Sequence, residues 1–493
     1  MSKTSPRPLG DLTADVPGLM VDADALSQQV TGITEDSRQV GPGSIFVAMK
    51  GSVVDGRSFI PQAAEAGAKL VLAEHGTQVP DGVTLLAADN PRAVFARLAA
   101  GWHGPQPKHI AAVTGTNGKT STAQFTHQFW SLLDRKAAAM GNLGITNPDG
   151  SVTPTGVLNT PMPMQLHSQL AGFAEQGIDR VAFEASSHGL DQHRLDGVRV
   201  SAAGFTNLTR DHLDYHGTEQ AYFEAKARLF SEVMPRGGVA VLNADVPHYP
   251  QLSVLARDAG HKVLSYGEKG LDLRVERLEP EAGGQKLIVQ VMGSNNGVMI
   301  PMIGRFQVWN ILAALGLVIA SGEEWLDALR VIDKLQGVRG RMEKVADTRK
   351  GAAIYVDYAH TPDAIETVLT NIRPHVSGKL HCLFGCGGDR DKGKRPQMAE
   401  AAARYADKVI ITDDNPRSED PATIRADAQV GAPDAMNIGG RADAIREAVS
   451  GLGKGDVLVI AGKGHEQGQT IGAETLPFDD ATEARKAVKE LKA

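Results

Sequence analysis

Cysteine is scarce in this chain, which has two cysteines among 493 residues. A small secreted scaffold held together by disulfides needs several pairs, so that class is excluded and a reducing compartment is expected. The two thiols, Cys382 and Cys386, lie four residues apart on and after an apolar run. Because no further cysteine completes a metal-binding set, we expect both to be core residues.

The chain also lacks long apolar runs and an excess of positive charge. No run of apolar residues reaches the roughly 18 needed for a membrane span, and the N-terminus has no apolar signal-peptide core, so neither segment is expected. Lys and Arg number 51 against 58 Asp and Glu, a formal net charge of −7. That balance excludes a nucleic-acid coat protein. We expect a cytoplasmic protein whose partners are not nucleic acids.

The residues that are present suit several soluble domains. The chain is 42% hydrophobic and 22% charged, and its length predicts about three domains. Short apolar runs alternate with helical patterns, as in parallel α/β sheets. Two glycine-containing stretches, Gly104–Lys108 and Gly337–Arg341, indicate boundaries, which predicts domains over 1–106, 107–338 and 339–493. We predict an α/β fold of three domains, with a central parallel-sheet P-loop ATPase domain and a C-terminal doubly wound, Rossmann-like domain.

Two local predictions concern the region between the central and last domains. From Leu271 to Ile303 the pattern indicates short antiparallel strands with turns such as GSNNG. After an apolar helix from about Phe306 to Ala320, a second helix is predicted from about Glu323 to Leu335.

A glycine-rich loop follows the predicted strand His109–Val113. It reads Gly115-Thr116-Asn117-Gly118-Lys119-Thr120-Ser121 and leads into a helix. Backbone N–H groups of such a loop approach phosphate oxygens, a lysine neutralises their charge, and a threonine hydroxyl reaches Mg²⁺. The standard spacing places a glycine where this chain has Val113, so the loop is a variant. A glycine turn without a ligand is the alternative, but strand, loop and helix coincide as the motif requires.

The segment TGTNGKTS resembles the ATP loop of the Mur ligases, which form amide bonds in bacterial cell-wall synthesis. Folylpolyglutamate synthetases share that loop, so it does not by itself separate the two groups. In either group the loop residues bind ATP. The expected loop contacts are Gly115, Thr116, Asn117, Gly118, Lys119, Thr120 and Ser121.

Two further segments follow predicted strands and carry acids and histidines. A carboxylate at the carboxyl end of a strand beside a phosphate loop suits Mg²⁺, which makes Glu184 a candidate ligand. His212 and His216 are four residues apart, a spacing that also occurs in zinc sites, but no further ligand cluster accompanies them. A hydrogen-bonded histidine pair is the commoner structure.

The same segments, EASSHGL and NLTRDHLDYH, resemble signatures of the Mur ligases that add the third residue of the peptide. The resemblance implies that Glu184 and His212 bind Mg²⁺ with Thr120, and that Lys226 carries a CO₂-derived carbamate that also binds metal. It implies catalytic roles for Lys119, Glu184, His212 and Lys226. Without the resemblance, Lys226 would be taken for a solvated helix lysine.

The resemblance extends to substrate contacts in all three domains. It implies that Asn310, Arg341 and Asp357 contact the nucleotide, where a helix cap, a linker arginine and a strand-end turn are the alternatives. The first domain would bind the UDP sugar, the central one ATP, and the last the amino acid. The implied contacts to the UDP-sugar dipeptide are Ser37, Ser52, Val53, Val54, Asn159, Thr160, Ser186, Gln192 and Arg194. Asn159 stands where the family usually has threonine.

The last domain carries the segment Asp414-Asn415-Pro416-Arg417 after a predicted strand. Alone it indicates a turn. In the family it matches the motif of enzymes that add meso-diaminopimelate, whose extra carboxylate Arg417 would bind through a bidentate pair. The implied contacts are Arg390, Asp414, Asn415, Pro416, Arg417, Gly462 and Glu466.

The resemblance therefore implies an ATP-dependent, ADP-forming ligase that adds meso-diaminopimelate to UDP-N-acetylmuramoyl-L-alanyl-D-glutamate. Its substrates are small molecules, its metal is Mg²⁺, and a monomer is expected. Two alternatives stay open. One is a folylpolyglutamate synthetase. The segments Asp-Asn-Pro-Arg and Gly-Lys-Gly-His-Glu, the second at Gly462–Glu466, argue against it. The other is a nucleotide-binding scaffold without chemistry, against which the intact candidate residues argue.

Overall fold

The computed structural model describes residues 5–14, 16–51, 54–154, 158–281 and 283–491. The chain divides into two compact units. The first contains Met1–Arg274 and Asn310–Ala328, and the second contains Val275–Trp309 and Leu329–Ala493.

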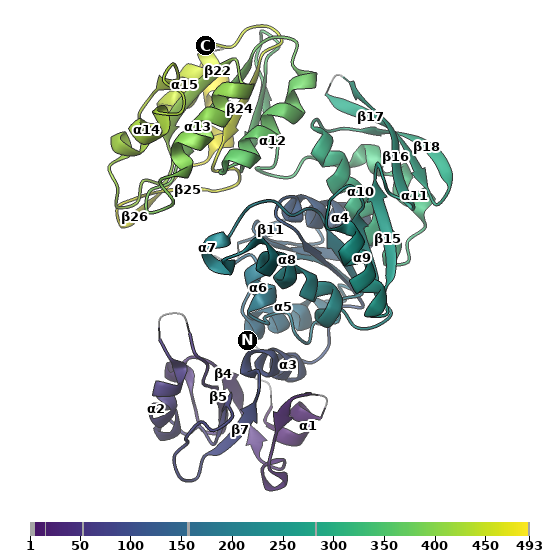
Figure 1. The fold of residues 1–493 in the computed structure, drawn as a ribbon, viewed down its shortest axis with the longest axis vertical. Coiled ribbons are helices and arrows are strands. Elements are labelled where there is room, and N and C mark those ends of the chain that lie inside the picture. The colour runs from purple at the N-terminus through teal and green to yellow at the C-terminus, as the bar shows by residue number, and fades with distance from the viewer. Residues whose placement is uncertain (1–4, 15, 52–53, 155–157, 282, 492–493) are drawn as a thin grey trace. The chain divides into compact units, whose positions relative to one another are not determined.

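The first hundred residues form their own sheet within the first unit (Figure 1). Its parallel strands β4, β5, β6 and β7 are bordered by the antiparallel β2. The helix α3 begins as expected, because the Asn90 side chain accepts a hydrogen bond from the Ala93 N–H and Pro91 takes the first turn. The bounds are β2 (Leu19–Met20), β4 (Gly32–Thr34), β5 (Ser44–Val47), α2 (Ile60–Glu65), β6 (Leu70–Glu74), β7 (Thr84–Ala88) and α3 (Pro91–His103).

The central sheet of the first unit is largely parallel. Strands β9, β12, β8, β13, β14 and β15 lie side by side in that order and all run in one direction, whereas β10 and β11 are antiparallel. Their bounds are β8 (His109–Thr114), β9 (Ala137–Gly141), β10 (Gly144–Thr146), β11 (Val152–Thr153), β12 (Arg180–Glu184), β13 (Ala202–Phe205), β14 (Val239–Asn243) and β15 (Lys262–Gly267).

Helices cover both faces of this sheet, which explains why its strands are apolar throughout. One face packs against α5 (Pro163–Glu175), α8 (Glu219–Arg228) and α9 (Tyr249–Asp258). On the other face, α10 (Arg305–Ala320) brings Leu317 close to Gly204, and α4 (Lys119–Leu132) donates a hydrogen bond from the Trp130 indole to the Ser321 hydroxyl. The parallel sheet that leads into the glycine-rich loop is therefore confirmed.

A buried ion-pair group lies at the opposite end of β12 from the loop. Glu323 is 8% exposed and accepts hydrogen bonds from Arg135 at 3.0 Å and from Arg180, the first residue of β12, at 2.7 Å. Two arginines on one carboxylate offset the cost of burying it.

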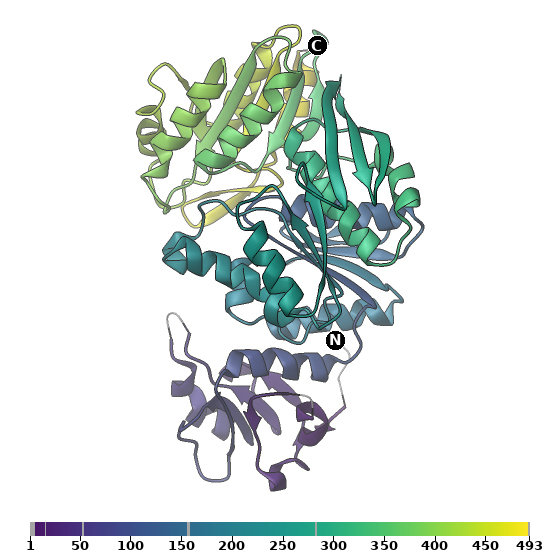
Figure 2. The same cartoon turned by 45° about the vertical axis from the view of Figure 1, so that its right-hand side comes forward.

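The second unit contains a doubly wound sheet with helices packed on it (Figure 2). Its strand order is β19-β20-β24-β21-β22-β23, and every strand is parallel to its neighbours except β19. Helices α12, α13 and α14 pack on one face, and α15 and α16 pack on the other. The strands are β19 (Glu343–Asp347), β20 (Ala353–Asp357), β21 (Leu380–Cys386), β22 (Lys408–Asp413), β23 (Met436–Asn437) and β24 (Val457–Ala461). The helices are α12 (Pro362–Ile372), α13 (Lys394–Tyr405), α14 (Pro421–Gln429), α15 (Arg441–Ser450) and α16 (Asp480–Glu490). Cys382 and Cys386 are buried free thiols of this core, as expected.

Two local predictions differ from the structure. The antiparallel pair β17 (Gly284–Val291) and β18 (Ser294–Ile300) turns at Met292 and Gly293, whose φ values of +47° and +87° suit a tight hairpin turn, so the segment SNNG lies inside β18. The helix expected to continue to Leu335 ends earlier: α11 covers Trp325–Arg330, followed by a short 3₁₀ turn. The β-branched pair Val331 and Ile332 disfavours further α-helix at that point.

Every helix in the described part of the chain is too short or too polar to span a bilayer.

Candidate functional site

The glycine-rich loop depends on two glycines with positive φ. Gly115 has φ of +143° and Gly118 has φ of +85°. A Cβ on Gly115 would lie 1.9 Å from the Thr206 hydroxyl oxygen, and one on Gly118 would lie 2.3 Å from the Asn310 amide oxygen. The loop therefore packs tightly against the carboxyl end of β13 and against α10, and the Asn310 amide lies next to Gly118.

Two lysines converge on one carbonyl group of this loop. Lys119 donates from Nζ to the carbonyl oxygens of Gly115 at 2.9 Å and Thr116 at 2.7 Å. Lys226, on α8, donates to the same Gly115 oxygen at 2.7 Å and is 1% exposed. Burial, with a further contribution from the charge of Lys119, holds the pKa of the Lys226 amine well below its usual value. Lys226 is thus a buried loop-facing residue, which its sequence context does not indicate.

A hydroxyl and a carboxylate meet beside the loop. β12 pairs with β8 in parallel register, with Glu184 opposite Val113, so the last residue of β12 lies next to the start of the loop. Thr120 Oγ1 donates to Glu184 Oε1 at 2.9 Å, and the Asn142 N–H donates to the same oxygen at 2.7 Å. The Thr120 hydroxyl and the Glu184 carboxylate thus place two buried oxygen atoms side by side, and oxygen atoms are the ligands that Mg²⁺ prefers.

His212 belongs to a group of aromatic rings near the lysines. It begins the short helix α7 (Leu213–His216) with φ of +53°, and its ring centroid lies 4.9 Å from that of His188 and 6.2 Å from that of Tyr222. Lys226 Nζ lies 4.3 Å from the centroid of the Tyr222 ring. Burial lowers the pKa of His212, against the opposing effect of the Asp211 carboxylate 3.4 Å from its Nε2, and so favours the neutral imidazole, the form that binds a metal.

The zinc alternative gains no support. His216 contacts His188 at 5.5 Å between ring centroids, but within the described ranges no three His, Cys, Asp or Glu side chains are grouped for metal binding. This absence does not concern the expected Mg²⁺ site, because only two of its residues, Glu184 and His212, are of those types.

The residues expected to bind the muramoyl dipeptide form a hydrogen-bonded network. Thr160 Oγ1 donates to the Glu184 carbonyl oxygen at 2.9 Å and lies 3.0 Å from Ser186 Oγ, and Arg194 Nη1 donates to the Thr160 carbonyl oxygen at 2.8 Å. Arg194 Nε also donates to Gln192 at 3.1 Å. Thr160, Ser186, Gln192 and Arg194 are thus brought together next to Glu184, with Asn159 preceding Thr160 in the chain.

Two of the residues expected to bind uridine, Ser37 and Val54, lie in loops of the first sheet. Ser37 starts a 3₁₀ turn after β4, and its hydroxyl donates to Gln62 at 3.3 Å. Val54 is 52% exposed. Ser52 and Val53 lie outside the described residues.

The second unit holds the residues expected to bind the amino acid. Gly388 donates its N–H to the Asn415 carbonyl oxygen, and Arg417 Nη1 donates to the Gly388 carbonyl oxygen at 2.7 Å. A Cβ on Gly387 would lie 3.0 Å from Arg417 Nη1 and 3.7 Å from Arg390 Cγ, so both arginines flank this glycine. The Arg417 guanidinium therefore lies beside a backbone without a side chain, where it could bind a carboxylate.

The loop after β24 completes this group. Asn415 Nδ2 donates to Glu466 Oε2 at 3.1 Å, and Gly462, with φ of +111°, brings its backbone near the Asp414 carboxylate. After Asn415, the Pro416 carbonyl oxygen accepts the Glu419 N–H at 3.0 Å, which closes a turn that contains Arg417. Asp414, Asn415, Pro416, Arg417, Gly462 and Glu466 are therefore neighbours in one unit.

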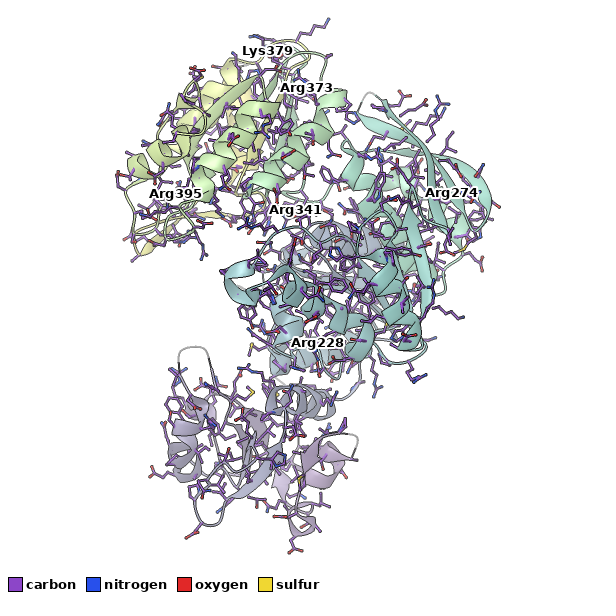
Figure 3. The ribbon with its side chains drawn as sticks, in the orientation of Figure 1. Arg228, Arg274, Arg341, Arg373, Lys379 and Arg395 are labelled. Atoms are coloured by element: carbon purple, nitrogen blue, oxygen red, sulfur yellow. The ribbon has the colours of Figure 1, made fainter. Side chains whose placement is uncertain are left out.

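Two expected nucleotide contacts also lie in the second unit. The buried Asp357 carboxylate accepts the N–H groups of Met342 at 2.7 Å and Ala359 at 2.8 Å, and burial raises its pKa. Arg341, labelled in Figure 3, stacks its guanidinium 4.3 Å from the Tyr358 ring centroid.

Several neighbours of these residues were missed in the sequence. Tyr222 could have been found by its position four residues before Lys226 on one helix face. Lys463 lies in the Gly-Lys-Gly-His-Glu segment, but nothing in that pattern indicates that it is buried.

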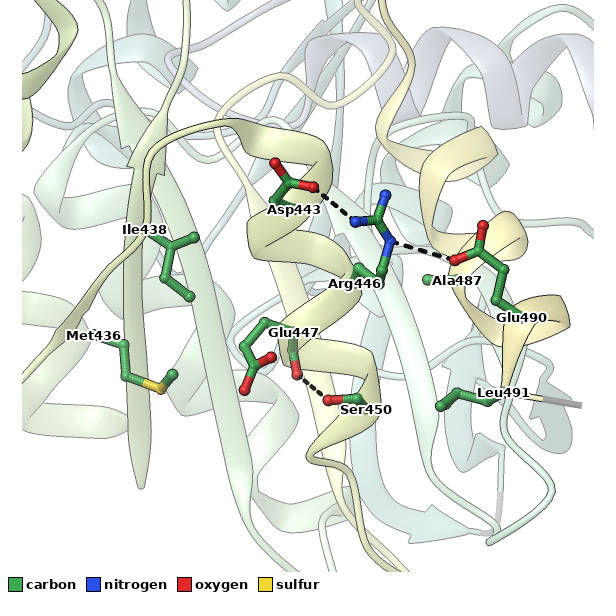
Figure 4. Close-up of a pocket in the computed structure, with 9 residues that line it drawn as sticks. All are labelled: Met436, Ile438, Asp443, Arg446, Glu447, Ser450, Ala487, Glu490 and Leu491. Atoms are coloured by element: carbon green, nitrogen blue, oxygen red, sulfur yellow. Dashed lines mark hydrogen bonds and ion pairs between the residues drawn. The ribbon is translucent and has the colours of Figure 1, made fainter.

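A pocket between β23, α15 and α16, where Arg446 bridges Asp443 and Glu490, includes none of the expected residues (Figure 4).

Comparisons with known proteins assign the chain to one family. Family models match over most of the chain: the Mur ligase family catalytic domain over residues 29–102, the Mur ligase middle domain over 113–318, and the Mur ligase glutamate ligase domain over 340–464. A curated relative from Caulobacter vibrioides, UDP-N-acetylmuramoyl-L-alanyl-D-glutamate--2,6-diaminopimelate ligase, is 48% identical over 465 residues, covering 93% of this chain and 96% of that protein.

Solved structures show the same fold. A UDP-N-acetylmuramoyl-L-alanyl-D-glutamate--2,6-diaminopimelate ligase has a TM-score of 0.73 and 34% identity, covering 99% of this chain and 100% of that one. The Mycobacterium tuberculosis folylpolyglutamate synthase, solved with ADP and AMPPCP, has a TM-score of 0.62 at 19% identity, covering 81% of this chain and 94% of that one. This second likeness concerns the fold alone.

Proposed function

Because the chain belongs to the Mur ligase family, we propose that it is an ATP-dependent ligase that joins meso-diaminopimelate to UDP-N-acetylmuramoyl-L-alanyl-D-glutamate. The reaction makes one amide bond in a peptidoglycan precursor and releases ADP and phosphate. The observation that carries the proposal is the convergence of Lys119, Lys226, Thr120 and Glu184 on one phosphate-type loop. That loop follows a parallel strand, the place where α/β sheets bind phosphates.

The chemistry proceeds in two steps. A carboxylate oxygen of the dipeptide attacks the γ-phosphorus of ATP, the bond to ADP breaks, and an acyl phosphate forms. The amine of diaminopimelate then attacks the acyl carbon, phosphate leaves, and the amine loses a proton. Lys119 and the loop N–H groups stabilise the charge that develops on the transferred phosphate. The Thr160 and Arg194 network beside Glu184 holds the dipeptide near that phosphate.

Magnesium would be held by Thr120, Glu184, His212 and a carbamate on Lys226. The buried Thr120 hydroxyl and Glu184 carboxylate are adjacent, and oxygen donors suit this hard cation. Bound Mg²⁺ supplies positive charge to the phosphates.

The carbamate fits the position of Lys226. Only a neutral amine attacks CO₂, forming an N–C bond with loss of one proton, and burial favours the neutral amine here. The resulting anion would lie near the Lys119 ammonium.

The chain divides its substrates among three domains, over 1–106, 107–338 and 339–493. Ser37, Ser52, Val53 and Val54 would contact the UDP sugar, Asn310, Arg341 and Asp357 the nucleotide of ATP, and Arg390, Arg417 and Glu466 the amino acid. The protein acts as a monomer in the cytoplasm, where UDP-linked precursors and ATP are available.

The test is ADP release by the whole chain with ATP, Mg²⁺ and the UDP-dipeptide, with meso-diaminopimelate or L-lysine as acceptor. We expect turnover with diaminopimelate to exceed that with lysine by at least about 100-fold, because lysine lacks the second carboxylate that Arg390 and Arg417 would bind. Equal rates with the two acceptors would refute the specificity.

The same assay separates the alternatives. A folylpolyglutamate synthetase would release ADP with a folate and glutamate instead. A nucleotide-binding scaffold would release none with any acceptor.

A further inference from the structure

We propose that Lys463 is a positioning residue of the acceptor site, which fixes the Asn415 amide and the Glu466 carboxylate in the orientation that receives diaminopimelate. The inference rests on the proposed function, since it concerns the site of the incoming amino acid. Lys463 does not contact the reacting atoms and acts through these two neighbours.

Lys463 is completely buried, with 0% of its surface exposed. Its Nζ donates to Asn415 Oδ1 at 3.0 Å and to Glu466 Oε2 at 3.1 Å. Asn415 Nδ2 donates to the same Glu466 oxygen at 3.1 Å, which closes a triangle of three side chains. A buried ammonium without such partners would be strongly destabilising, so the triangle is an integral part of the loop.

The triangle determines which way the Asn415 amide faces. Its Oδ1 accepts from Lys463 and also from the Thr470 backbone N–H at 3.0 Å. Rotating the amide by half a turn would place its NH₂ group against two donors. Lys463 therefore keeps Nδ2 directed at Glu466.

The Glu466 carboxylate keeps one oxygen for a ligand. Both hydrogen bonds from the triangle end on Oε2, and the Glu466 side chain is 36% exposed. Oε1 is thus the oxygen on which the ammonium group of an amino acid would bind. A carboxylate held from behind by a lysine loses little side-chain entropy when the ligand arrives.

The backbone around Lys463 explains why its side chain turns inward. Gly462 and Gly464 both have positive φ, +111° and +54°, and Glu466 donates its N–H to the Lys463 carbonyl oxygen at 3.0 Å. A Cβ on Gly464 would lie 2.8 Å from the Gly340 carbonyl oxygen, so this turn is tightly packed.

The network also reaches Arg417, the expected carboxylate ligand. Thr470 donates to Asn415, and its carbonyl oxygen accepts the Arg417 N–H at 3.1 Å. Lys463 thus supports both ends of one amino-acid site: Glu466 for an ammonium and, through Thr470, the backbone of Arg417 for a carboxylate.

The experiment uses Lys463→Met in the full chain and measures ADP release while each substrate is varied. We expect the KM for meso-diaminopimelate to rise by at least about tenfold, because a charge-assisted network is lost. The KM for ATP and for the UDP-dipeptide should stay within about twofold. Lys486→Met, which removes a lysine 57% exposed on α16, is the matched control and should leave all three unchanged.

A purely structural role predicts a different result. In that case Lys463→Met would lower the thermal midpoint and the kcat without a selective change in the KM for diaminopimelate, and the proposal would be wrong. A double variant with Glu466→Gln adds a second criterion. If Lys463 acts through Glu466, the double variant loses no more than the more damaging single one; fully additive losses would contradict it.

Two further outcomes are distinguishable. If Lys463→Met does not fold, Asn415→Asp tests the same triangle, since Oδ1 remains for Lys463 and Thr470 while the donor to Glu466 is lost; an unchanged KM for diaminopimelate would then refute the proposal. If the wild-type chain releases no ADP with diaminopimelate, the proposed function itself fails, and the role of Lys463 fails with it.

Discussion

Lys226 donates a hydrogen bond from Nζ to the carbonyl oxygen of Gly115, 111 residues earlier in the chain, at 2.7 Å. The lysine is buried on α8, and the glycine opens the loop that the proposed function assigns to ATP. This contact places a lysine of low amine pKa where the phosphate chemistry would occur.

Lys226→Met should lower the rate of ADP release by at least about 100-fold, because the methionine keeps the bulk but cannot carry a carbamate or bind metal. Wild-type activity should also fall in CO₂-depleted buffer and recover when bicarbonate is added. Lys489→Met, at an exposed position of α16, is the control. Full activity of Lys226→Met, or indifference of the wild type to bicarbonate, would count against the carbamate.

Gly115→Ala should raise the KM for ATP by at least about tenfold and lower the thermal midpoint, because the new Cβ would meet the Thr206 hydroxyl at 1.9 Å and strain a φ of +143°. Gly172→Ala, in α5 with nothing within 4 Å of the added Cβ, is the matched control. That control should stabilise the chain slightly, by up to about 1 kcal/mol. Comparable behaviour of the two variants would show that the loop tolerates a side chain.

Arg417→Lys should raise the KM for meso-diaminopimelate by about 100-fold while the KM for ATP changes little. Lysine keeps the charge but loses the planar fork that pairs with a carboxylate. Steady-state kinetics with each substrate varied would measure this, with Arg446→Lys as a control outside the expected site. A selective rise in the KM for ATP would reassign Arg417 to the nucleotide.

His167 should make the first unit sensitive to acid. Burial lowers the pKa of this α5 imidazole to about 4, so the unfolded chain, with the usual value of 6.5, binds its proton first as the pH falls. The stability contributed by the neutral ring is complete above about pH 6.5 and is lost toward pH 4, amounting to about 2 kcal/mol between pH 7.5 and 5.

His167→Leu should therefore show a smaller drop in thermal midpoint between those two pH values than the wild type. Calorimetry at both pH values gives the drop in thermal midpoint for each protein. The other titrating groups contribute equally to both drops, so the difference between the two drops reports on His167. His75→Leu, a histidine 44% exposed and paired with Asp89, is the control. An equal drop in the wild type and His167→Leu would show that this ring does not govern acid unfolding.

The sequence predicted what is local. The Asn90 cap and the loop after His109–Val113 depend on residues within a few positions of each other, and both are confirmed. The α/β class follows from the alternation of apolar strands and helical patterns, which is equally local.

Long-range contacts could not be predicted in this way. The burial of Lys226 depends on Gly115 and Tyr222, and that of Lys463 on Asn415, which precedes it by 48 residues. Hydropathy assigns a lysine to the surface, because it does not include partners that only the fold brings near. The turn between β17 and β18 was predicted at the wrong residues for another reason. It is formed by Met292 and Gly293, both with positive φ, and methionine is not a typical residue of such turns.

Arg180 and Glu184 occupy the two ends of β12, and this has a consequence for how the strand can change in evolution. Arg180 is held by Glu323 at one end, and Glu184 must meet Thr120 at the other. Successive residues of a strand point to opposite faces, so the loss or gain of one residue between them would turn Glu184 away from the loop. The strand can exchange the side chains between these two residues, but its length cannot change by a single residue without the loss of the Thr120 contact.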